Sequence, residues 1–200
     1  MVVAHDITSA SSITVVVTKR RPLSPLSYVP PDLVTLTGVP GDGVDQLRAE
    51  AAAGITRMYE AAAAAGVPFR ISTAYRDYEY QEFLYAGEVR QSGVAAADRL
   101  VARPGYSEHQ TGLTADIYDV PENQLKPSFG ESGAGTWIRE HAHEYGFIVS
   151  YPDGSEPVTG YTYEPWHVRY VGEEIAREMR ETGVDTLQEH FGVEASPDYG

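Results

Sequence analysis

Helix-like and strand-like patterns follow one another in this chain without the regular alternation of a βαβ protein. Apolar residues recur three and four positions apart from Val44 to Ala65, as in a helix, whereas FRIST (69–73) alternates like a short strand. Further helical patterns cover 77–93, 95–101, 136–147, 173–183 and 185–191, while ADIYDV (115–120) predicts a strand and FIVSY with GYTYEPWHVRYV predicts a hairpin. We therefore predict an α+β fold.

The length of 200 residues fits one medium domain with a hydrophobic core of its own. We expect a flexible leader at 1–12, where the residues are small and polar, a single domain at 13–192, and a frayed tail at 193–200. The β-branched stretch ITVVVT (13–18) predicts a strand, and four prolines between Pro22 and Pro31 hold the next segment extended. Its apolar side chains are expected to pack inward: Leu23, Leu26 and Tyr28.

The charge balance excludes several classes of function. Twenty-nine acidic residues against 15 basic ones give a formal charge of −14, which repels phosphate backbones, so we expect no nucleic-acid partner. The absence of cysteine removes disulfides, thiol catalysis and cysteine-type zinc sites. No apolar run is long enough to span a membrane. The beginning of the chain lacks the features of a signal peptide, so either the protein is not exported this way or a targeting segment has been trimmed.

The nucleophiles left to this chain are few. No serine is followed three residues later by lysine, no G-x-S-x-G elbow occurs, and the helical zinc motif H-E-x-x-H is absent. Water, an unactivated hydroxyl or a carboxylate remain available as nucleophiles, and water at neutral pH needs activation. A zinc ion held by three protein ligands provides this, since it lowers the pKa of bound water to about 7.

His109 and Asp116 lie seven positions apart in YSEHQTGLTAD (106–116). On a helix they would be separated by about 10.5 Å along the axis, and on a strand they would face opposite sides. Neither geometry lets both hold one ion. A reversal at Gly112 would bring them together, because glycine accepts positive φ at little cost. We therefore predict a turn there, with a surface loop and a capping aspartate as the alternative.

A second polar motif, YEPWHVRY (163–170), carries Glu164 and His167. Pro165 excludes a helix interior and forces the preceding residue into an extended conformation. In a regular strand the two side chains would face opposite ways, but a bulge or turn at Pro165 and Trp166 could bring both into one pocket. A half-buried edge strand with a hydrogen-bonded histidine is the alternative.

The other histidines fit a metal site less well. His5 falls in the predicted leader and His190 near the frayed end, so neither has a rigid scaffold. His141 and His143 lie two positions apart on a predicted helix and point about 200° away from each other, so they cannot share an ion. We interpret His141 as a packed or hydrogen-bonded core histidine.

SEHQTGLTAD (107–116) and EPWH (164–167) together closely resemble the two zinc signatures of VanY-type D-alanyl-D-alanine carboxypeptidases. Further blocks resemble the family in the same order, namely RPLSPLSYVPPDLV, AYRDYEYQ, WIREHAHEYGFIVSYP and GYTYEPWHVRYVG, so that the resemblance covers roughly 15–180. It implies the zinc-peptidase fold shared with the hedgehog signalling domain, in which a small central antiparallel sheet is flanked by helices.

The resemblance also implies the roles of individual residues. It makes His109, Asp116 and His167 the ligands of one zinc ion and Glu164 the general base. Arg76 matches the family arginine that faces the substrate or its developing oxyanion, and the five donors of a guanidinium suit either partner. A surface salt bridge is the alternative for this arginine, because the chain is rich in acids.

Four further positions match substrate contacts or the pocket wall in the family. Gln81 and Ser107 match residues that contact substrate, while Tyr151 and Trp166 match the wall of the pocket.

The activity implied by the resemblance is zinc-dependent hydrolysis of the terminal D-Ala-D-Ala bond of peptidoglycan stem peptides, outside the cytoplasm. Stem peptides or muropeptides are the expected partners, and we expect a monomer. The same chemistry would serve an LD-carboxypeptidase, an endopeptidase that cleaves L-Ala-D-Glu, or a dipeptidase, because the shape of the pocket selects the bond. An alternative of another class is a non-catalytic, zinc-containing module that binds cell-wall peptides. The presence of Glu164 favours an enzyme.

Overall fold

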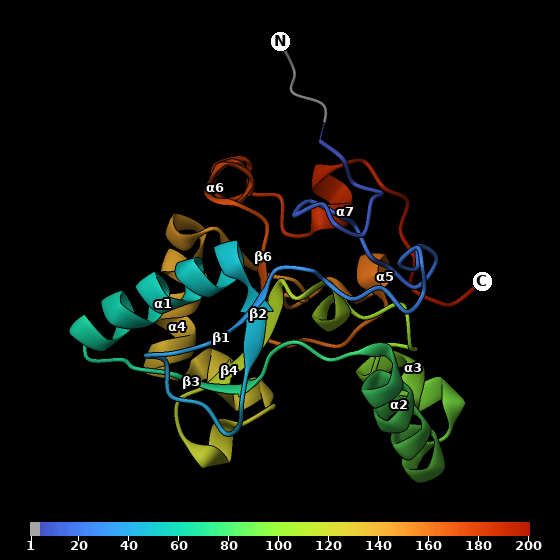
Figure 1. Cartoon of the computed structure of the whole chain (residues 1–200), viewed down its shortest axis with the longest axis horizontal. Helices are drawn as coiled ribbons and strands as arrows, with labels where there is room; N and C mark the ends of the chain where they lie inside the picture. The colour runs from blue at the N-terminus through green and yellow to red at the C-terminus, as the bar shows by residue number, and fades with distance from the viewer. Residues whose placement is uncertain (1–4) are drawn as a thin grey trace.

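The computed structural model describes residues 5–200 (Figure 1). Its strands are β1 (Leu33–Thr35), β2 (Gln46–Arg48), β3 (Arg70–Thr73), β4 (Thr114–Tyr118), β5 (Phe147–Val149) and β6 (His167–Tyr170). Its α-helices are α1 (Ala49–Ala64), α2 (Tyr78–Ser92), α3 (Val94–Leu100), α4 (Gly133–His141), α5 (Glu156–Thr159), α6 (Glu173–Thr182) and α7 (Leu187–His190). Short 3₁₀ turns are η1 (Glu108–Thr111), η2 (Pro121–Asn123), η3 (Pro127–Glu131) and η4 (Ala142–Tyr145).

A four-stranded antiparallel sheet forms the centre of the molecule, in the order β3-β4-β6-β5. Strand β4 lies between β3 and β6 and is buried along its whole length. The register places Asp116 of β4 opposite His167 of β6. Strands β1 and β2 form a separate pair. The small antiparallel sheet and the α+β class predicted from the sequence are thus confirmed.

The main core lies between this sheet and the helices α1 and α4. In Figure 1 the two helices lie together beside the sheet. The helix predicted from Val44 to Ala65 begins only at Ala49, because residues 46–48 pair with β1 as strand β2. The apolar residues of this segment still lie in the core, among them Leu47, Ile55 and Met58. Burial of such side chains is the main favourable contribution to folding, at about 25 cal/mol per Å² of apolar surface.

The strand predicted at 13–18 is wrong. This segment makes only an isolated bridge between Thr18 and Arg21. Its consecutive valines are all buried, with Val15 and Val17 in one apolar cluster and Val16 in another. The segment therefore buries side chains on both sides without pairing with another strand. Its β-branched residues are explained by burial and not by membership of a sheet. In the following segment Leu23 is buried as predicted, but Leu26 is 46% exposed.

Both ends of the described chain contact the domain. The predicted leader lies partly outside the described residues, at 1–4; within the remainder, Ala10 is buried and the Ser11 carbonyl accepts a hydrogen bond from Arg48. At the other end, the Pro197 carbonyl accepts a hydrogen bond from Lys19, and the Tyr199 hydroxyl accepts one from a backbone N–H. Among residues 5–200, no helix combines the length and the hydrophobicity that crossing a lipid bilayer requires.

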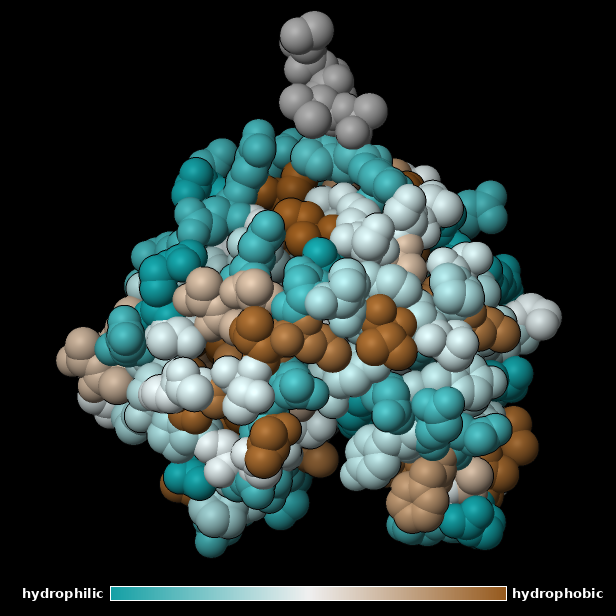
Figure 2. All heavy atoms as spheres, viewed as in Figure 1, coloured by the Kyte–Doolittle hydropathy of each residue, from teal (hydrophilic) through white to brown (hydrophobic). Residues whose placement is uncertain are grey.

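Helices α2 and α3 pack against each other and form a lobe at one side of the molecule (Figure 1). As predicted, Asp77 caps the start of α2, where its carboxylate accepts a hydrogen bond from the backbone N–H of Tyr80 at 2.8 Å. Gly93 ends this helix. The space-filling view in Figure 2 shows a notch between this lobe and the body that carries the sheet. The candidate site lies at the boundary between these two parts.

Candidate metal centre

A hollow between the sheet and the α2–α3 lobe brings together most of the residues predicted from the sequence. Eight of the predicted site residues line this hollow: Arg76, Ser107, His109, Asp116, Tyr151, Glu164, Trp166 and His167. The lobe supplies the opposite wall, with Leu84, Glu88 and Leu100.

The predicted reversal between His109 and Asp116 is confirmed. His109 lies in the short turn η1, Gly112 follows with φ of 68°, and the chain returns as β4. A side chain at Gly112 would be strained by this left-handed conformation, and its Cβ would lie 2.9 Å from Leu33 Cδ2. The reversal places His109 Nε2 at 3.2 Å from Asp116 Oδ2.

The turn predicted at Pro165 and Trp166 is also present. The backbone N–H of His167 donates to the Glu164 carbonyl at 3.1 Å, which closes a four-residue turn around Pro165 and Trp166. Strand β6 begins at His167, directly opposite Asp116. As a result, His167 Nδ1 lies 3.4 Å from Asp116 Oδ1 and 3.6 Å from Glu164 Oε2.

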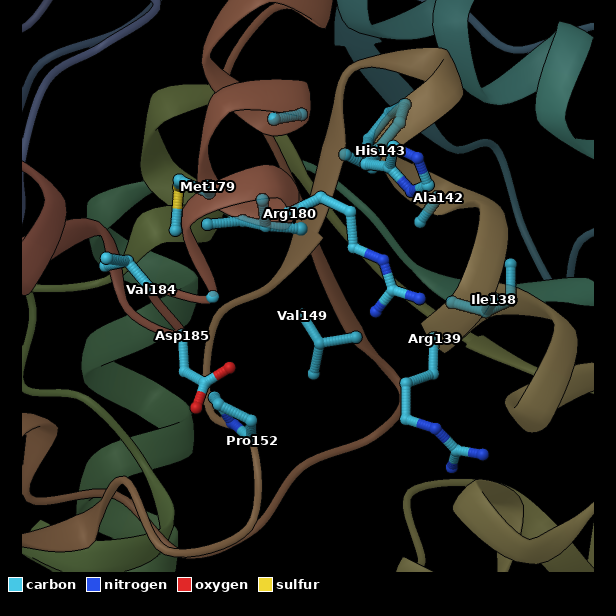
Figure 3. Close-up of a pocket in the computed structure, with 14 residues that line it drawn as sticks. Ile138, Arg139, Ala142, His143, Val149, Pro152, Met179, Arg180, Val184 and Asp185 are labelled. Atoms are coloured by element: carbon cyan, nitrogen blue, oxygen red, sulfur yellow. The ribbon is translucent and has the colours of Figure 1, made fainter.

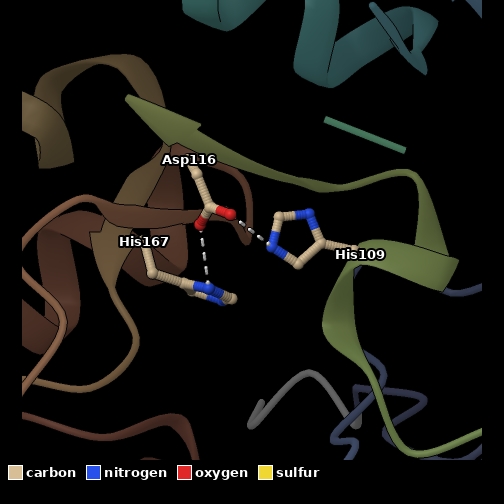
Figure 4. Close-up of side chains that lie close together, drawn as sticks. All are labelled: His109, Asp116 and His167. Carbon is tan, nitrogen blue, oxygen red and sulfur yellow. Dashed lines mark ion pairs between the residues drawn. The ribbon is translucent and has the colours of Figure 1, made fainter. Parts of the chain in front are cut away.

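His109, Asp116 and His167 form a group that could hold a metal ion (Figure 4). One ligand atom from each lies within 4.8 Å of the others, and all three residues are buried. His109 Nε2 and Asp116 Oδ1 have no hydrogen-bond partner, which is costly for buried polar atoms. The far ring nitrogens are occupied, since His109 Nδ1 lies 2.7 Å from the Ala74 carbonyl and His167 Nε2 lies 2.9 Å from Glu108. Two nitrogens and one oxygen therefore face a common point, a donor set that fits zinc with a further position left open.

The electrostatics of this cluster follow from its burial. Burial lowers the pKa of His109 to about 4, so that its ring is neutral at pH 7 and keeps a free lone pair. Burial raises the pKa of Glu164 to about 8, and the negative charge of Asp116 adds to this. For His167, burial alone would lower the pKa, but the carboxylates of Asp116 and Glu108 raise it to about 9. A cation bound among these groups would favour their deprotonated forms.

Arg76 follows β3 and lines the hollow. Its backbone N–H donates to the His109 carbonyl at 3.4 Å, which ties it to the turn that carries this histidine. None of the ion pairs formed within residues 5–200 includes Arg76, and its buried Nε has no hydrogen-bond partner. The alternative of a surface salt bridge is therefore wrong, and the guanidinium is free to meet a ligand.

The predicted substrate contacts divide into two groups. Ser107, Tyr151 and Trp166 line the hollow, and the Tyr151 ring lies 4.6 Å from that of His167, centre to centre. Gln81, by contrast, does not line it. This side chain is fully buried on α2 and donates to the Ala102 carbonyl at 2.8 Å, so it supports the wall from behind.

His141 differs from its prediction. Its side chain is 39% exposed and its Nδ1 lies 2.8 Å from Glu144 Oε1, so it is hydrogen-bonded but not in the core. Its ring stacks on that of Trp137 at 4.8 Å, and Trp137 is itself only partly buried, so this stripe of α4 lies at the edge of the core. Neither this histidine nor His143 belongs to the metal-binding group.

Two charged residues near the cluster were missed. Glu108 and Arg169 are both buried and form an ion pair at 3.0 Å next to His167. A signal for Arg169 was available, because residues two apart on a strand share a face and Arg169 follows His167 by two. Glu108 precedes His109 directly, but no local pattern distinguishes a buried glutamate from an exposed one in a loop.

A separate hollow lies between α4, β5 and α6 (Figure 3). Arg139, Val149 and Arg180 are among the residues that line it (Figure 3). None of the residues predicted as catalytic, substrate-binding or metal-binding lines it.

Comparisons with known proteins bear on the activity. A family model described as VanY, D-alanyl-D-alanine carboxypeptidase, matches residues 44–173. The chain is 40% identical over 146 residues to the putative carboxypeptidase YodJ of Bacillus subtilis (strain 168). This match covers 72% of the chain and 53% of the relative. The chain is 37% identical over 106 residues to the bifunctional D-Ala-D-Ala dipeptidase and D-Ala-D-Ala carboxypeptidase VanXYC of Enterococcus gallinarum, covering 52% and 56%. The matches thus span about half the length of these relatives.

Solved structures extend the similarity over nearly the whole chain. The LdcB LD-carboxypeptidase superposes with a TM-score of 0.84 and 36% identity, covering 92% of this chain and 88% of the other. VanYB in complex with D-alanine-D-alanine superposes with a TM-score of 0.76 and 28% identity, covering 90% and 97%. A variant of the D,D-pentapeptidase VanY in complex with Zn(II) has a TM-score of 0.75 and 28% identity, covering 92% and 99%.

Proposed function

The chain belongs to the VanY family of D-alanyl-D-alanine carboxypeptidases, and from this premise we propose that it is a zinc-dependent enzyme that removes the terminal D-alanine of peptidoglycan stem peptides ending in D-Ala-D-Ala. The observation that carries the proposal is the meeting of His109, Asp116 and His167 with Glu164 and Arg76 in one hollow. Because its substrate lies in the cell wall, the enzyme would act outside the cytoplasm.

We assign one zinc ion to the group of His109 Nε2, Asp116 Oδ1 and His167 Nδ1. These atoms converge, and the Zn(II) complex of VanY supports the choice of metal. When bound, zinc would lower the pKa of water and polarise a carbonyl group. The protein would hold it between the adjacent strands β4 and β6 and the turn η1, an arrangement that keeps the three ligands in fixed positions.

Glu164 is the proposed general base. Its Oε2 lies 3.6 Å from His167 Nδ1, on the turn before β6, and a cation bound beside it would favour the carboxylate form that a base requires. It would take a proton from the attacking water and deliver it to the amine of the leaving D-alanine.

Arg76 is the proposed partner of the substrate's negative charge. Its guanidinium lines the hollow without an acidic partner among the described residues. It could stabilise the developing oxyanion or bind the terminal carboxylate of the peptide. This local positive charge matters in a protein whose formal charge is −14. Ser107, Tyr151 and Trp166 would complete the walls around the peptide end.

An L,D-carboxypeptidase is the second candidate. The LdcB LD-carboxypeptidase has a TM-score of 0.84 over 92% of this chain, and an L,D-carboxypeptidase DacB is 39% identical over a similar share. Both activities release a C-terminal D-alanine, so the same metal, base and arginine would serve either one. They differ in the residue that precedes the scissile bond.

Defined muropeptides distinguish the candidates. The purified protein is incubated with pentapeptide, tetrapeptide or intact sacculus, with and without a chelator, and the products are identified by mass spectrometry. Chelator-sensitive conversion of pentapeptide to tetrapeptide is expected. Conversion of tetrapeptide to tripeptide would support the second candidate, and cleavage between L-Ala and D-Glu would support an endopeptidase. Binding of these peptides without any cleavage would overturn the enzyme and favour a binding module.

A further inference from the structure

Glu108 lies directly behind the metal-binding group. Its side chain is 6% exposed, and both of its oxygens are hydrogen-bonded. Oε2 accepts from His167 Nε2 at 2.9 Å and from the Ser150 hydroxyl at 2.7 Å, while Oε1 accepts from Arg169 Nη1 at 3.0 Å. This carboxylate therefore contacts the side of His167 that faces away from the group.

Arg169 holds this carboxylate in place. It is completely buried, and each nitrogen of its guanidinium donates to an acceptor of fixed position. Nε donates to the carbonyl of Tyr170 at 3.0 Å, and Nη2 donates to the carbonyls of Ile13 and Val15 at 3.0 and 3.1 Å. A buried carboxylate is tolerated only with such a paired and hydrogen-bonded partner.

The contact with Glu108 determines which nitrogen of His167 is free. Because the carboxylate only accepts hydrogen bonds, Nε2 of His167 must carry a hydrogen. The lone pair of the neutral ring is then on Nδ1, the atom that faces Asp116 and Glu164. His109 is oriented differently, by the backbone carbonyl of Ala74. Only one of the two histidines thus depends on a side chain for its orientation.

We propose that Glu108, held by Arg169, is a positioning residue that fixes the tautomer and ring orientation of His167 and thereby sets the affinity of the site for its metal. The inference rests on the proposed function of His167 as a ligand. Acceptors that orient a ligating histidine in this way typically change metal affinity by about 10- to 100-fold when they are lost.

The test compares Glu108→Gln with Ser150→Ala in the full chain. Glu108→Gln keeps the size of the side chain but turns an amide towards either His167 or Arg169. We expect zinc to bind about 10- to 100-fold more weakly, as measured by competition with a chelator. In the NMR spectrum of the zinc-loaded protein, the slowly exchanging Nε2–H signal of His167 should be lost or shifted. Ser150→Ala removes a different hydrogen bond from the same oxygen and should keep both the affinity and this signal.

A second variant tests the proposal in case the first one does not fold. If Glu108→Gln does not fold, Glu108→Gln combined with Arg169→Met removes both buried charges together, which proteins tolerate better than the loss of one partner. We expect this protein to fold and still bind zinc weakly. The proposal is overturned if either variant binds zinc as tightly as the wild type or keeps the slowly exchanging Nε2–H signal at its wild-type position. These readouts need no peptide substrate, so a wild-type protein inactive on every muropeptide would reject the proposed function without affecting this result.

Discussion

The two walls of the hollow are built in opposite ways. On the sheet side, every residue of η1, β4 and β6 is buried, and the charged groups are connected by hydrogen bonds. On the lobe side, Gln81 is the one buried residue of α2, and Ala97 is the one buried residue of α3. Tyr80 and Phe83 of α2 are 51% and 65% exposed.

The two walls are therefore expected to have different functions. Groups that must hold a metal or move a proton need fixed positions, and close packing supplies them. A wall of exposed helices has fewer buried contacts and can open locally at lower cost in free energy. We therefore expect substitutions on the sheet side to change metal binding or turnover, and substitutions on the lobe side to change substrate binding or local stability.

The largest effect should come from His109→Ala. Loss of one of three ligands should leave the purified protein without bound metal and without detectable activity. Elemental analysis after dialysis measures the first and the muropeptide assay the second. His143→Ala, in the other hollow, is the control and should retain both. One tightly held zinc ion in His109→Ala would show that the ligand set is wrong.

Glu164→Gln should separate metal binding from turnover. The amide cannot accept the proton of water, so kcat should fall by about 10²- to 10⁴-fold while the zinc content is unchanged. Glu88→Gln, across the hollow on α2, makes the same chemical change on the lobe side and should leave kcat nearly intact. A Glu164→Gln enzyme with wild-type kcat would remove this residue from the mechanism.

Arg76→Lys should reduce kcat/KM by about 10²-fold, since a lysine keeps the charge but not the fork of donors. The zinc content should not change. The matched control is Arg139→Lys, at the edge of the separate hollow. Equal kcat/KM values for Arg76→Lys and the wild type would mean that the planar donor geometry is not used.

Leu84→Ala tests the lobe side. Removing part of the apolar wall should raise KM by on the order of tenfold and leave kcat and zinc content unchanged. Phe83→Ala, on the same helix but not in the lining, is the control. A fall in kcat with constant KM would contradict the division between the two walls.

The smallest effect is expected for Asp77→Ala, which removes the cap of α2. The free energy of unfolding should fall by about 1 kcal/mol, which lowers Tm by about 2–4 °C in a chain of this size. Glu82→Ala, at an exposed position beyond the first turn of α2, serves as the control in the same thermal unfolding experiment. An unchanged Tm together with lost zinc would mean that the lobe and the metal site are coupled.

The features that the sequence predicted correctly depend on local stereochemistry. The reversal at Gly112 and the turn at Pro165 follow from what glycine and proline permit, so the two motifs alone were sufficient. The strand order could not be predicted in this way, because β4 pairs with β3 and β6 across long sequence separations. For the same reason the contact between Glu108 and Arg169, 61 positions apart, was missed. Gln81 was matched by its motif, but only the packing of α2 shows that it is bonded to the Ala102 carbonyl and does not line the hollow.

The part of this chain that the family model matches is smaller than the part that packs around the candidate site. The family match begins at residue 44, yet the carbonyls that accept from Arg169 belong to Ile13 and Val15. A fragment cut at residue 44 would leave a fully buried guanidinium without two of its acceptors. A fragment designed for expression and crystallography should therefore begin before Ile13, upstream of the residues that the family model matches.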